Sequence, residues 1–190
     1  MNKSEIISLF TVQIKICENF LNQNEINDLL LNIKKNKHGN HTALEGKAIS
    51  SHDINTNILD EENIKNKLHN IINEYSNVLG IDEQTLDNSW TNIQGKNSIL
   101  KKHSHGLSPI SGAIYLKVDE LSSNIYFYNP NPYIHNMSIK NYNTNNYHYV
   151  FFKPKIGDLF IFPGWLHHGS DYEKNNSEER IVLSFNTKNK

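Results

Sequence analysis

The chain has 190 residues, enough for one domain with a sizeable hydrophobic core. Its formal net charge of −1 gives no electrostatic reason to expect binding to nucleic acid or to an anionic membrane surface. Cys17 is the sole cysteine, which excludes an internal disulfide framework and a thiolate metal cluster and favours a small buried side chain.

The beginning of the chain carries no sign of targeting. The stretch "MNKSEIISLF" includes an acidic residue and lacks the apolar run of a signal peptide. No run of about 18 apolar residues occurs elsewhere, so no transmembrane helix is expected. We therefore expect a cytoplasmic protein.

The first third of the chain favours one strand followed by a helix. β-Branched and apolar residues in "LFTVQIKI" (9–16) predict the strand. The helix is expected within 21–37, where Asn22 and Glu25 stand in capping-box positions. Its apolar residues recur at helical spacing: Ile26, Leu29, Leu30 and Ile33.

A polar loop is expected over 37–59, and a second helix over 61–80. Gly80 is a plausible carboxyl-terminal cap for this helix, because glycine readily adopts the left-handed conformation that ends helices. The spacing predicts one apolar face, made by Ile64, Leu68, Ile71, Tyr75 and Val78.

From residue 89 onward, short segments rich in Val, Ile, Phe and Tyr alternate with Gly, Asn and Pro clusters, which is typical of a sandwich or jelly roll. We expect one domain over 1–190, mainly β with flanking helices. Residues 1–88 would form a strand and supporting helices, and 89–187 the core. The predicted strands are 89–93, 110–118, 124–128, 147–154, 157–162 and 180–186.

The stretch "NPNPYIHNMSIKNYNTNN" (129–146) is long for a simple connection in a compact domain. Two interpretations remain open for it. It is either a solvated, partly disordered insertion or a lid that faces the substrate.

Two segments contain histidines in a pattern that suggests metal binding. His103 and His105 are separated by one residue, so both imidazoles point the same way on an extended segment. A third ligand must come from elsewhere, and the turn "PGWLHH" supplies His167 and His168 at the end of a strand. The remaining histidines are expected to be solvated: His38, His41, His52, His69, His135 and His148.

Arg180, in "NNSEERIVLSFN", is the only arginine among 19 basic side chains. A surface salt bridge with Glu178 or Glu179 would be worth about 0–1 kcal/mol, and lysine would serve equally well. A guanidinium is required where a carboxylate or phosphate is bound bidentately, which favours that role for Arg180.

These segments together resemble the Fe(II)- and 2-oxoglutarate-dependent oxygenases. More narrowly, the chain is similar to bacterial and phage 2OG-Fe(II) oxygenases related to prolyl hydroxylases. The resemblance implies a double-stranded β-helix, a cupin-like jelly roll with its metal at one mouth. It rests on "WTN" (90–92), "HSH" (103–105), "SGAIYL" (111–116), "FPGWLHH" (162–168) and "RIVLSFN" (180–186).

The resemblance implies an iron site formed by His103 and His168 together with the residue at position 105. Most relatives carry a carboxylate there, whereas this chain has His105. His105 either coordinates the iron or leaves that position to water, and we favour coordination.

The resemblance also implies that Arg180 and Tyr115 bind the distal carboxylate of 2-oxoglutarate. Many relatives have a serine two residues after the arginine that shares this contact, and here Val182 replaces it. Four further residues are candidates to line the pocket: Trp90, Asn92, Trp165 and His167.

The implied activity uses Fe(II), 2-oxoglutarate and O2 to hydroxylate a C–H bond, with release of succinate and CO2. The substrate is a peptide, such as one containing proline, or an amino acid or other small molecule. Two alternatives remain open: a three-histidine dioxygenase or isomerase that does not use 2-oxoglutarate, and a non-catalytic jelly-roll binding module.

Overall fold

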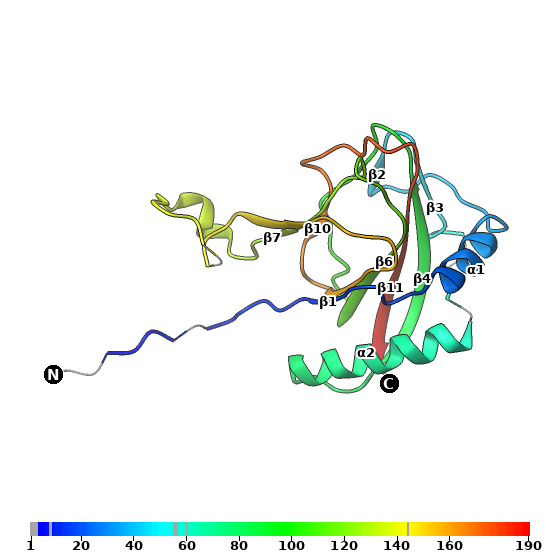
Figure 1. Ribbon diagram of the computed structural model, residues 1–190. Helices are drawn as coiled ribbons and strands as arrows, with labels where there is room; N and C mark the ends of the chain where they lie inside the picture. Colours follow the sequence, from blue (N-terminus) through cyan, green and yellow to red (C-terminus); the bar gives the residue numbers. More distant parts are fainter. Residues whose placement is uncertain (1–3, 8, 55–56, 60, 144) are drawn as a thin grey trace.

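The computed structural model describes residues 4–7, 9–54, 57–59, 61–143 and 145–190 (Figure 1). It is mainly β with two α-helices, as expected from the sequence. No helix within these residues is long and apolar enough to cross a membrane.

Antiparallel strands form one large and two small sheets. The main sheet has the order β1 (Lys15–Cys17), β9 (Leu159–Pro163), β6 (Ile110–Lys117), β11 (Arg180–Asn189), β4 (Gln84–Gln94) and β3 (Ala48–Ser50). A three-stranded sheet has the order β10 (His168–Gly169), β7 (Ile125–Tyr128) and β8 (Tyr149–Phe152). The remaining pair is β2 (Leu44–Glu45) with β5 (Ile99–Leu100).

Alternation along the strands gives the main sheet two different faces. On β11, Leu183 and Phe185 belong to the larger apolar core, which includes buried side chains of both helices. Val182, the residue before Leu183, points to the opposite face. It belongs to a second apolar core that also contains Phe127 of β7. The second face therefore lies opposite the three-stranded sheet, and it carries the candidate site.

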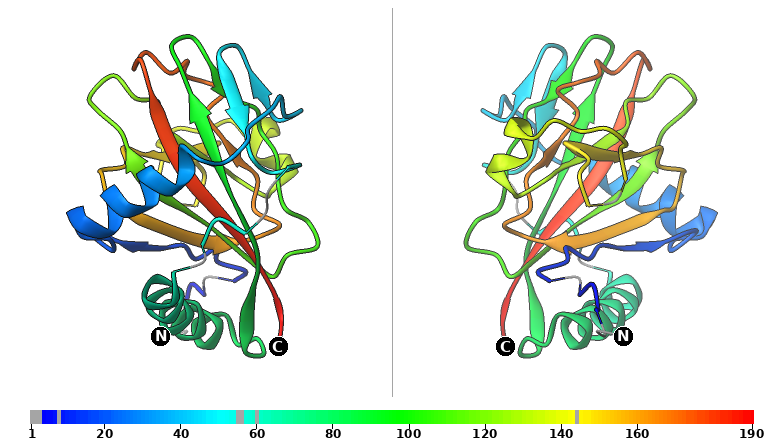
Figure 2. Two further views of the ribbon diagram at one scale, coloured as in Figure 1. Left: turned by 90° about the vertical axis from the view of Figure 1, so that its right-hand side faces the viewer. Right: turned by 90° about the vertical axis from the view of Figure 1, so that its left-hand side faces the viewer.

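The two helices cover the outer face of the main sheet, as predicted (Figure 2). α1 (Gln23–Ile33) begins at Asn22, whose side chain accepts hydrogen bonds from the backbone N–H groups of Asn24 and Glu25. The Glu25 carboxylate accepts from the Asn22 N–H in return, which confirms the predicted capping box.

α2 (Glu62–Leu79) ends at Gly80, whose φ of 67° confirms the predicted left-handed cap. The predicted apolar face is wrong in part. Ile72 rather than Ile71 is fully buried, and Val78 is exposed. The two adjacent isoleucines differ by about 100° around the helix axis, and packing against the sheet selects Ile72.

Two other predictions from the first third need correction. The predicted strand 9–16 pairs only from Lys15, and residues 9–12 are exposed, with a bend at Phe10. The predicted loop 37–59 contains β2 and β3, although residues 55 and 56 lie outside the described part of the chain. Cys17 packs at the edge of the main core, and burial raises the pKa of its thiol, as fits a packing role.

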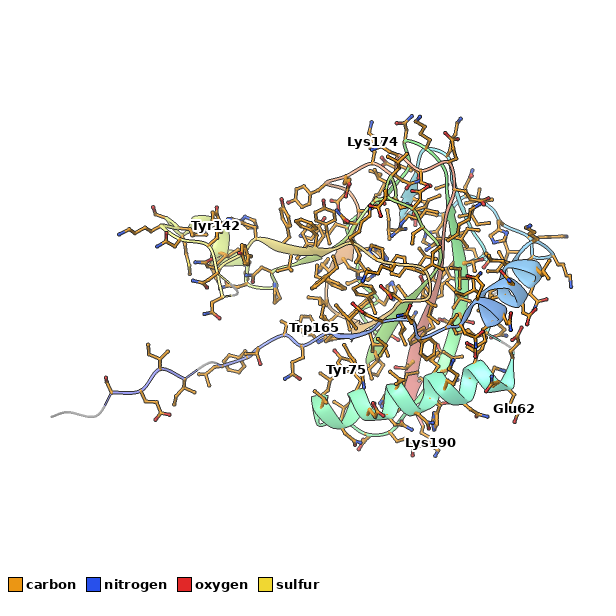
Figure 3. All side chains as sticks on the ribbon, viewed as in Figure 1. Glu62, Tyr75, Tyr142, Trp165, Lys174 and Lys190 are labelled. Atoms are coloured by element: carbon orange, nitrogen blue, oxygen red, sulfur yellow. The ribbon has the colours of Figure 1, made fainter. Side chains whose placement is uncertain are left out.

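The six strands predicted after residue 89 are all confirmed, as β4, β6, β7, β8, β9 and β11. The connection between β7 and β8 forms an arm that projects from the body of the molecule (Figure 1). It contains a short 3-10 helix, η1 (Pro132–Asn136), and Tyr142 lies far out on it (Figure 3). Residue 144 of the predicted loop 129–146 lies outside the described residues.

Candidate active site

The structure brings His103, His105 and His168 together from two distant parts of the chain. One ligand nitrogen from each lies within 4.8 Å of the others. His103 and His168 form an isolated antiparallel bridge, in which each backbone N–H donates to the other's carbonyl, at 3.0 and 2.9 Å. The His105 N–H donates to the Gly164 carbonyl at 2.7 Å. This bond attaches the segment that carries His103 and His105 to the turn before His168.

Gly164 is required for this attachment. A Cβ atom at this position would lie 2.0 Å from the Ser108 carbonyl oxygen, so any other residue would separate the two segments. The turn also decides which of its two histidines enters the cluster: His168 is buried, whereas His167 is exposed. His167 and Trp165 therefore do not line the cavity, contrary to the prediction, and Trp165 is 48% exposed (Figure 3).

Hydrogen bonds at Nδ1 fix how each imidazole presents its other nitrogen. Nδ1 of His103 lies 2.8 Å from the Lys101 carbonyl, and Nδ1 of His168 lies 2.9 Å from the Leu166 carbonyl. Nδ1 of His105 lies 2.7 Å from Oδ1 of Asn186. Because these oxygens only accept, each Nδ1 carries the hydrogen and each Nε2 keeps a free lone pair, the arrangement that metal-binding histidines have.

Burial keeps the three imidazoles neutral. It lowers the pKa of His105 to about 4 and lowers the pKa of His103, and it holds the pKa of His168 well below its usual range. His103 also disfavours the charged forms of His105 and His168, and His105 disfavours that of His168. Neutral imidazoles can coordinate a cation at physiological pH without first losing a proton.

A second histidine group lies beside the first. The ligand atoms of His41, His52 and Asp53 also lie within 4.8 Å of one another, and the His52 ring contacts Trp90, with ring centroids 4.7 Å apart. The prediction that His41 and His52 are solvated is therefore wrong: both are partly buried beside the cluster, because strand β3 draws their loop against β4.

The tautomers of this second group are less suited to a metal. The Ala43 N–H donates to Nδ1 of His41 at 3.2 Å, which places the hydrogen of the neutral ring on Nε2. Nδ1 of His52 pairs with the exposed Asp53 carboxylate at 2.8 Å. The first group is therefore the better candidate for a metal site.

Arg180 is buried at the other end of the same cavity, where 3% of the residue is exposed. The alternative of a surface salt bridge is excluded, since Glu178 lies near Lys96 and Glu179 pairs with Lys117. Within the described residues, Arg180 forms no salt bridge with a carboxylate. Burial lowers the pKa of the guanidinium, which nevertheless stays charged at neutral pH.

Two neutral side chains surround the Arg180 guanidinium. Its central carbon lies 5.2 Å from the centre of the Tyr115 ring, a cation–π contact, and its Nη1 donates to Oε1 of Gln94. Burial raises the pKa of Tyr115 to about 12, despite the opposing influence of the Arg180 charge. Tyr115 therefore keeps its hydroxyl hydrogen at neutral pH and remains a donor.

Two buried donors in this cavity have no partner among the described residues: Nε of Arg180 and Nε2 of Gln94. A buried unsatisfied donor costs about 1–3 kcal/mol, and more when it is charged. The Glu173 carboxylate acts on Arg180 only from beyond salt-bridge distance, so a carboxylate ligand would complete this buried guanidinium with its free N–H.

The strand register explains why these residues share one cavity. Arg180 lies directly opposite Gln94, and Val182 lies between Asn92 of β4 and Tyr115 of β6. Because alternate residues on a strand share a face, the cavity wall repeats every second position. The predicted residues Trp90, Asn92, Tyr115 and Arg180 all line it, together with Gln94, Val182 and Ser184.

The sequence matches a protein family described as "Putative 2OG-Fe(II) oxygenase" over residues 88–186, which is more than half of the chain. This chain belongs to that family. The matched segment includes all three clustered histidines and Arg180. The family implies Fe(II) and 2-oxoglutarate as cofactor and cosubstrate. Among curated proteins, no sequence match was found.

Solved structures of such oxygenases share the fold. A Pseudomonas putida prolyl-4-hydroxylase gives a TM-score of 0.67 at 10% identity, over 95% of this chain and 94% of that one. A viral collagen prolyl hydroxylase of Paramecium Bursaria Chlorella virus-1, in complex with 2-oxoglutarate, gives 0.60 at 13% identity, over 93% and 96%. HygX of Streptomyces hygroscopicus, with nickel, 2-oxoglutarate and hygromycin B bound, gives 0.64 at 10% identity, over 94% and 84%. The double-stranded β-helix predicted from the sequence is thus confirmed.

The residues of this cavity fit both groups that the family implies. Three neutral imidazoles with free Nε2 atoms suit Fe(II), for which imidazole is a common ligand. The unpartnered donors on Arg180 and Gln94 suit a carboxylate. Both sets of groups line the same cavity.

Proposed function

We propose that the protein is an Fe(II)- and 2-oxoglutarate-dependent dioxygenase that hydroxylates a C–H bond and releases succinate and CO2. The observation that carries the proposal is a buried arginine without a carboxylate partner, in the same cavity as three histidines with free Nε2 atoms. A buried arginine or a histidine cluster by itself would fit many kinds of protein, but together they match a metal and a dicarboxylate held side by side.

His103, His105 and His168 would hold the iron through Nε2, and Arg180 with Tyr115 would hold the distal carboxylate of 2-oxoglutarate. The bound metal supplies activation of O2, coupled to oxidative decarboxylation of the cosubstrate. The chain itself positions the two ligands and shields them: Phe162 and Val182 are buried apolar side chains of the cavity wall that limit access of water.

Two structural neighbours are named as prolyl hydroxylases, and a third was solved with hygromycin B, so both peptides and small molecules are represented among proteins with this fold. We propose a peptide, an amino acid or another small molecule as substrate. The arm between β7 and β8 does not line the cavity, so a lid function for it would require a movement toward the site.

The three-histidine ligand set also supports a second candidate, a dioxygenase or isomerase that uses no 2-oxoglutarate. Arg180 argues against it, because such an enzyme has no need for a buried guanidinium beside its metal. A non-catalytic binding module would need neither the metal nor the cosubstrate.

An anaerobic titration distinguishes these candidates. Protein loaded with Fe(II) is titrated with 2-oxoglutarate, and the weak visible charge-transfer band of the chelated cosubstrate is recorded. We expect a saturable band. A folded, iron-loaded protein without this band would refute the use of 2-oxoglutarate, and a folded protein that binds no iron would support the binding module.

The variant Arg180→Lys tests the carboxylate contact in the same titration. Lysine keeps the charge but loses the planar pair of donors, so the Kd for 2-oxoglutarate should rise about tenfold or more. Lys117→Met serves as the control, because Lys117 is an exposed cation paired with Glu179 near the same end of the sheet. An unchanged Kd in Arg180→Lys would remove Arg180 from the site.

A further inference from the structure

The carboxylate end of the cavity lacks one expected hydroxyl group and contains one buried amide. Val182 provides no hydrogen bond where many relatives carry a serine, and its register position lies between Asn92 and Tyr115. Gln94 is fully buried in the wall of the same cavity, where an amide is costly to hold unless each of its polar atoms has a partner.

The contact with Arg180 determines how the Gln94 amide is oriented. The two residues lie directly opposite each other on β4 and β11, and Nη1 of Arg180 donates to Oε1 of Gln94. The reverse orientation would set an NH2 group against a guanidinium, two donors facing each other. The amide therefore turns its NH2 group away from Nη1, and that Nε2 atom is buried without a partner among the described residues.

The unpartnered Nε2 of Gln94 and the unpartnered Nε of Arg180 belong to adjacent side chains in one cavity. A carboxylate can accept from both, because its two oxygens offer about four lone-pair sites. An apolar group would leave both donors unsatisfied, and a water molecule, which can accept from both, would leave the buried guanidinium without a counter-charge. The pair therefore selects for a planar anion with two oxygens.

We propose that Gln94 is a specificity-determining residue for 2-oxoglutarate. Its Oε1 holds the Arg180 guanidinium in place, and its Nε2 donates to the distal carboxylate in place of the hydroxyl that Val182 lacks. The proposal rests on the proposed function, since it assigns a further contact to the same cosubstrate.

Gln94→Leu removes both amide contacts while keeping a similar volume. We expect the Kd for 2-oxoglutarate, from the anaerobic titration, to rise about tenfold, while the Kd for Fe(II) or Co(II) stays unchanged. Gln84→Leu is the matched control: Gln84 is a buried glutamine on the same strand, but its amide bonds Asn189 outside the cavity. Gln84→Leu should leave both constants unchanged.

Gln94→Glu tests the proposal independently if Gln94→Leu does not fold. Its carboxylate would pair with Arg180 and supply the missing counter-charge within the chain. We expect saturable 2-oxoglutarate binding to be lost, while the thermal unfolding temperature without cosubstrate rises or stays constant.

The outcomes separate this inference from the proposed function. Wild-type protein that binds Fe(II) but not 2-oxoglutarate would overturn both. Wild-type protein that binds 2-oxoglutarate, with an unchanged Kd in Gln94→Leu or with binding retained in Gln94→Glu, would overturn the role of Gln94 alone.

Discussion

Asn186 connects the main sheet to the histidine cluster. Its Oδ1 accepts from Nδ1 of His105 and, at 2.8 Å, from Oγ of Ser111, which lies directly opposite it on β6. The Ser111 hydroxyl also lies 2.9 Å from the same imidazole nitrogen. Because the amide oxygen can only accept, it holds the hydrogen of His105 on Nδ1 and leaves Nε2 free.

We predict that Asn186→Leu weakens metal binding about 10- to 100-fold, the usual effect of losing a hydrogen bond that orients a metal ligand. Asn186→Asp keeps an acceptor at this position and should retain the wild-type affinity. Calorimetric titration with Co(II) under matched conditions measures the constants.

The control for this prediction is Asn88→Leu, since Asn88 lies opposite Asn186 on β4 and its Oδ1 has no hydrogen-bond partner among the described residues. An equal loss of metal affinity in Asn88→Leu and Asn186→Leu would mean that the loss comes from a disturbance of the sheet and not from the bond to His105. No loss in Asn186→Leu would mean that His105 is oriented by other contacts or does not bind the metal.

At the scale of single elements, the apolar pattern of α2 does not determine which of two adjacent isoleucines is buried. Ile71 and Ile72 are adjacent, and either could lie on the apolar face that Ile64, Leu68 and Tyr75 define. In the fold Ile72 is buried in the main core, whereas Ile71 is only partly buried at its edge.

Ile72→Ala should therefore lower the free energy of unfolding by about 2–5 kcal/mol, the cost of a cavity in a packed core. Ile71→Ala should cost clearly less. Urea denaturation of the two variants under identical conditions tests the orientation of the helix, and a larger loss in Ile71→Ala would contradict it.

Much of the fold was predictable because its elements carry local signals. The capping box at Asn22 and the cap at Gly80 are specified by residues within the helices themselves. The strands after residue 89 are long enough to show their composition. By contrast, β3 is three residues long and forms by pairing with β4, a distant partner, so its sequence alone contains little information.

The same distinction applies to the site. The resemblance identified the clustered histidines, Arg180 and Tyr115, but not Gln94 or Asn186. Gln94 lies two residues after Asn92, so the two side chains share the face of β4 that lines the cavity. The partners of Gln94 and Asn186 across the sheet depend on register, which two strands far apart in sequence do not reveal. The position of His41 and His52 depends on register in the same way.

At the scale of the whole molecule, the histidine cluster links stability to pH. The pKa of His105 is about 4 in the folded protein, against about 6.5 in an unfolded chain. Between these values the unfolded chain binds more protons, so lowering the pH favours unfolding. The pKa shifts of His103 and His168 have the same direction and add to the effect.

For the metal-free protein, we predict that the free energy of unfolding is steady above pH 7 and falls as the pH drops through 6.5 toward 4. His105 alone should contribute a loss of about 2 kcal/mol at pH 5. Urea denaturation at pH 7.5 and pH 5 measures this loss. His105→Gln should reduce the difference, and an equal difference in that variant would exclude His105 as its source.

The described cavity wall contains no acidic residue, which favours the entry of a doubly charged anion. The chain as a whole carries a net charge of −1, which by itself would weakly repel such a molecule. Inside the cavity, however, the guanidinium lies among apolar and neutral walls that screen its field poorly. We therefore expect the potential around the guanidinium to be positive, opposite in sign to the net charge of the chain, although the Glu173 carboxylate lies close enough to offset part of it.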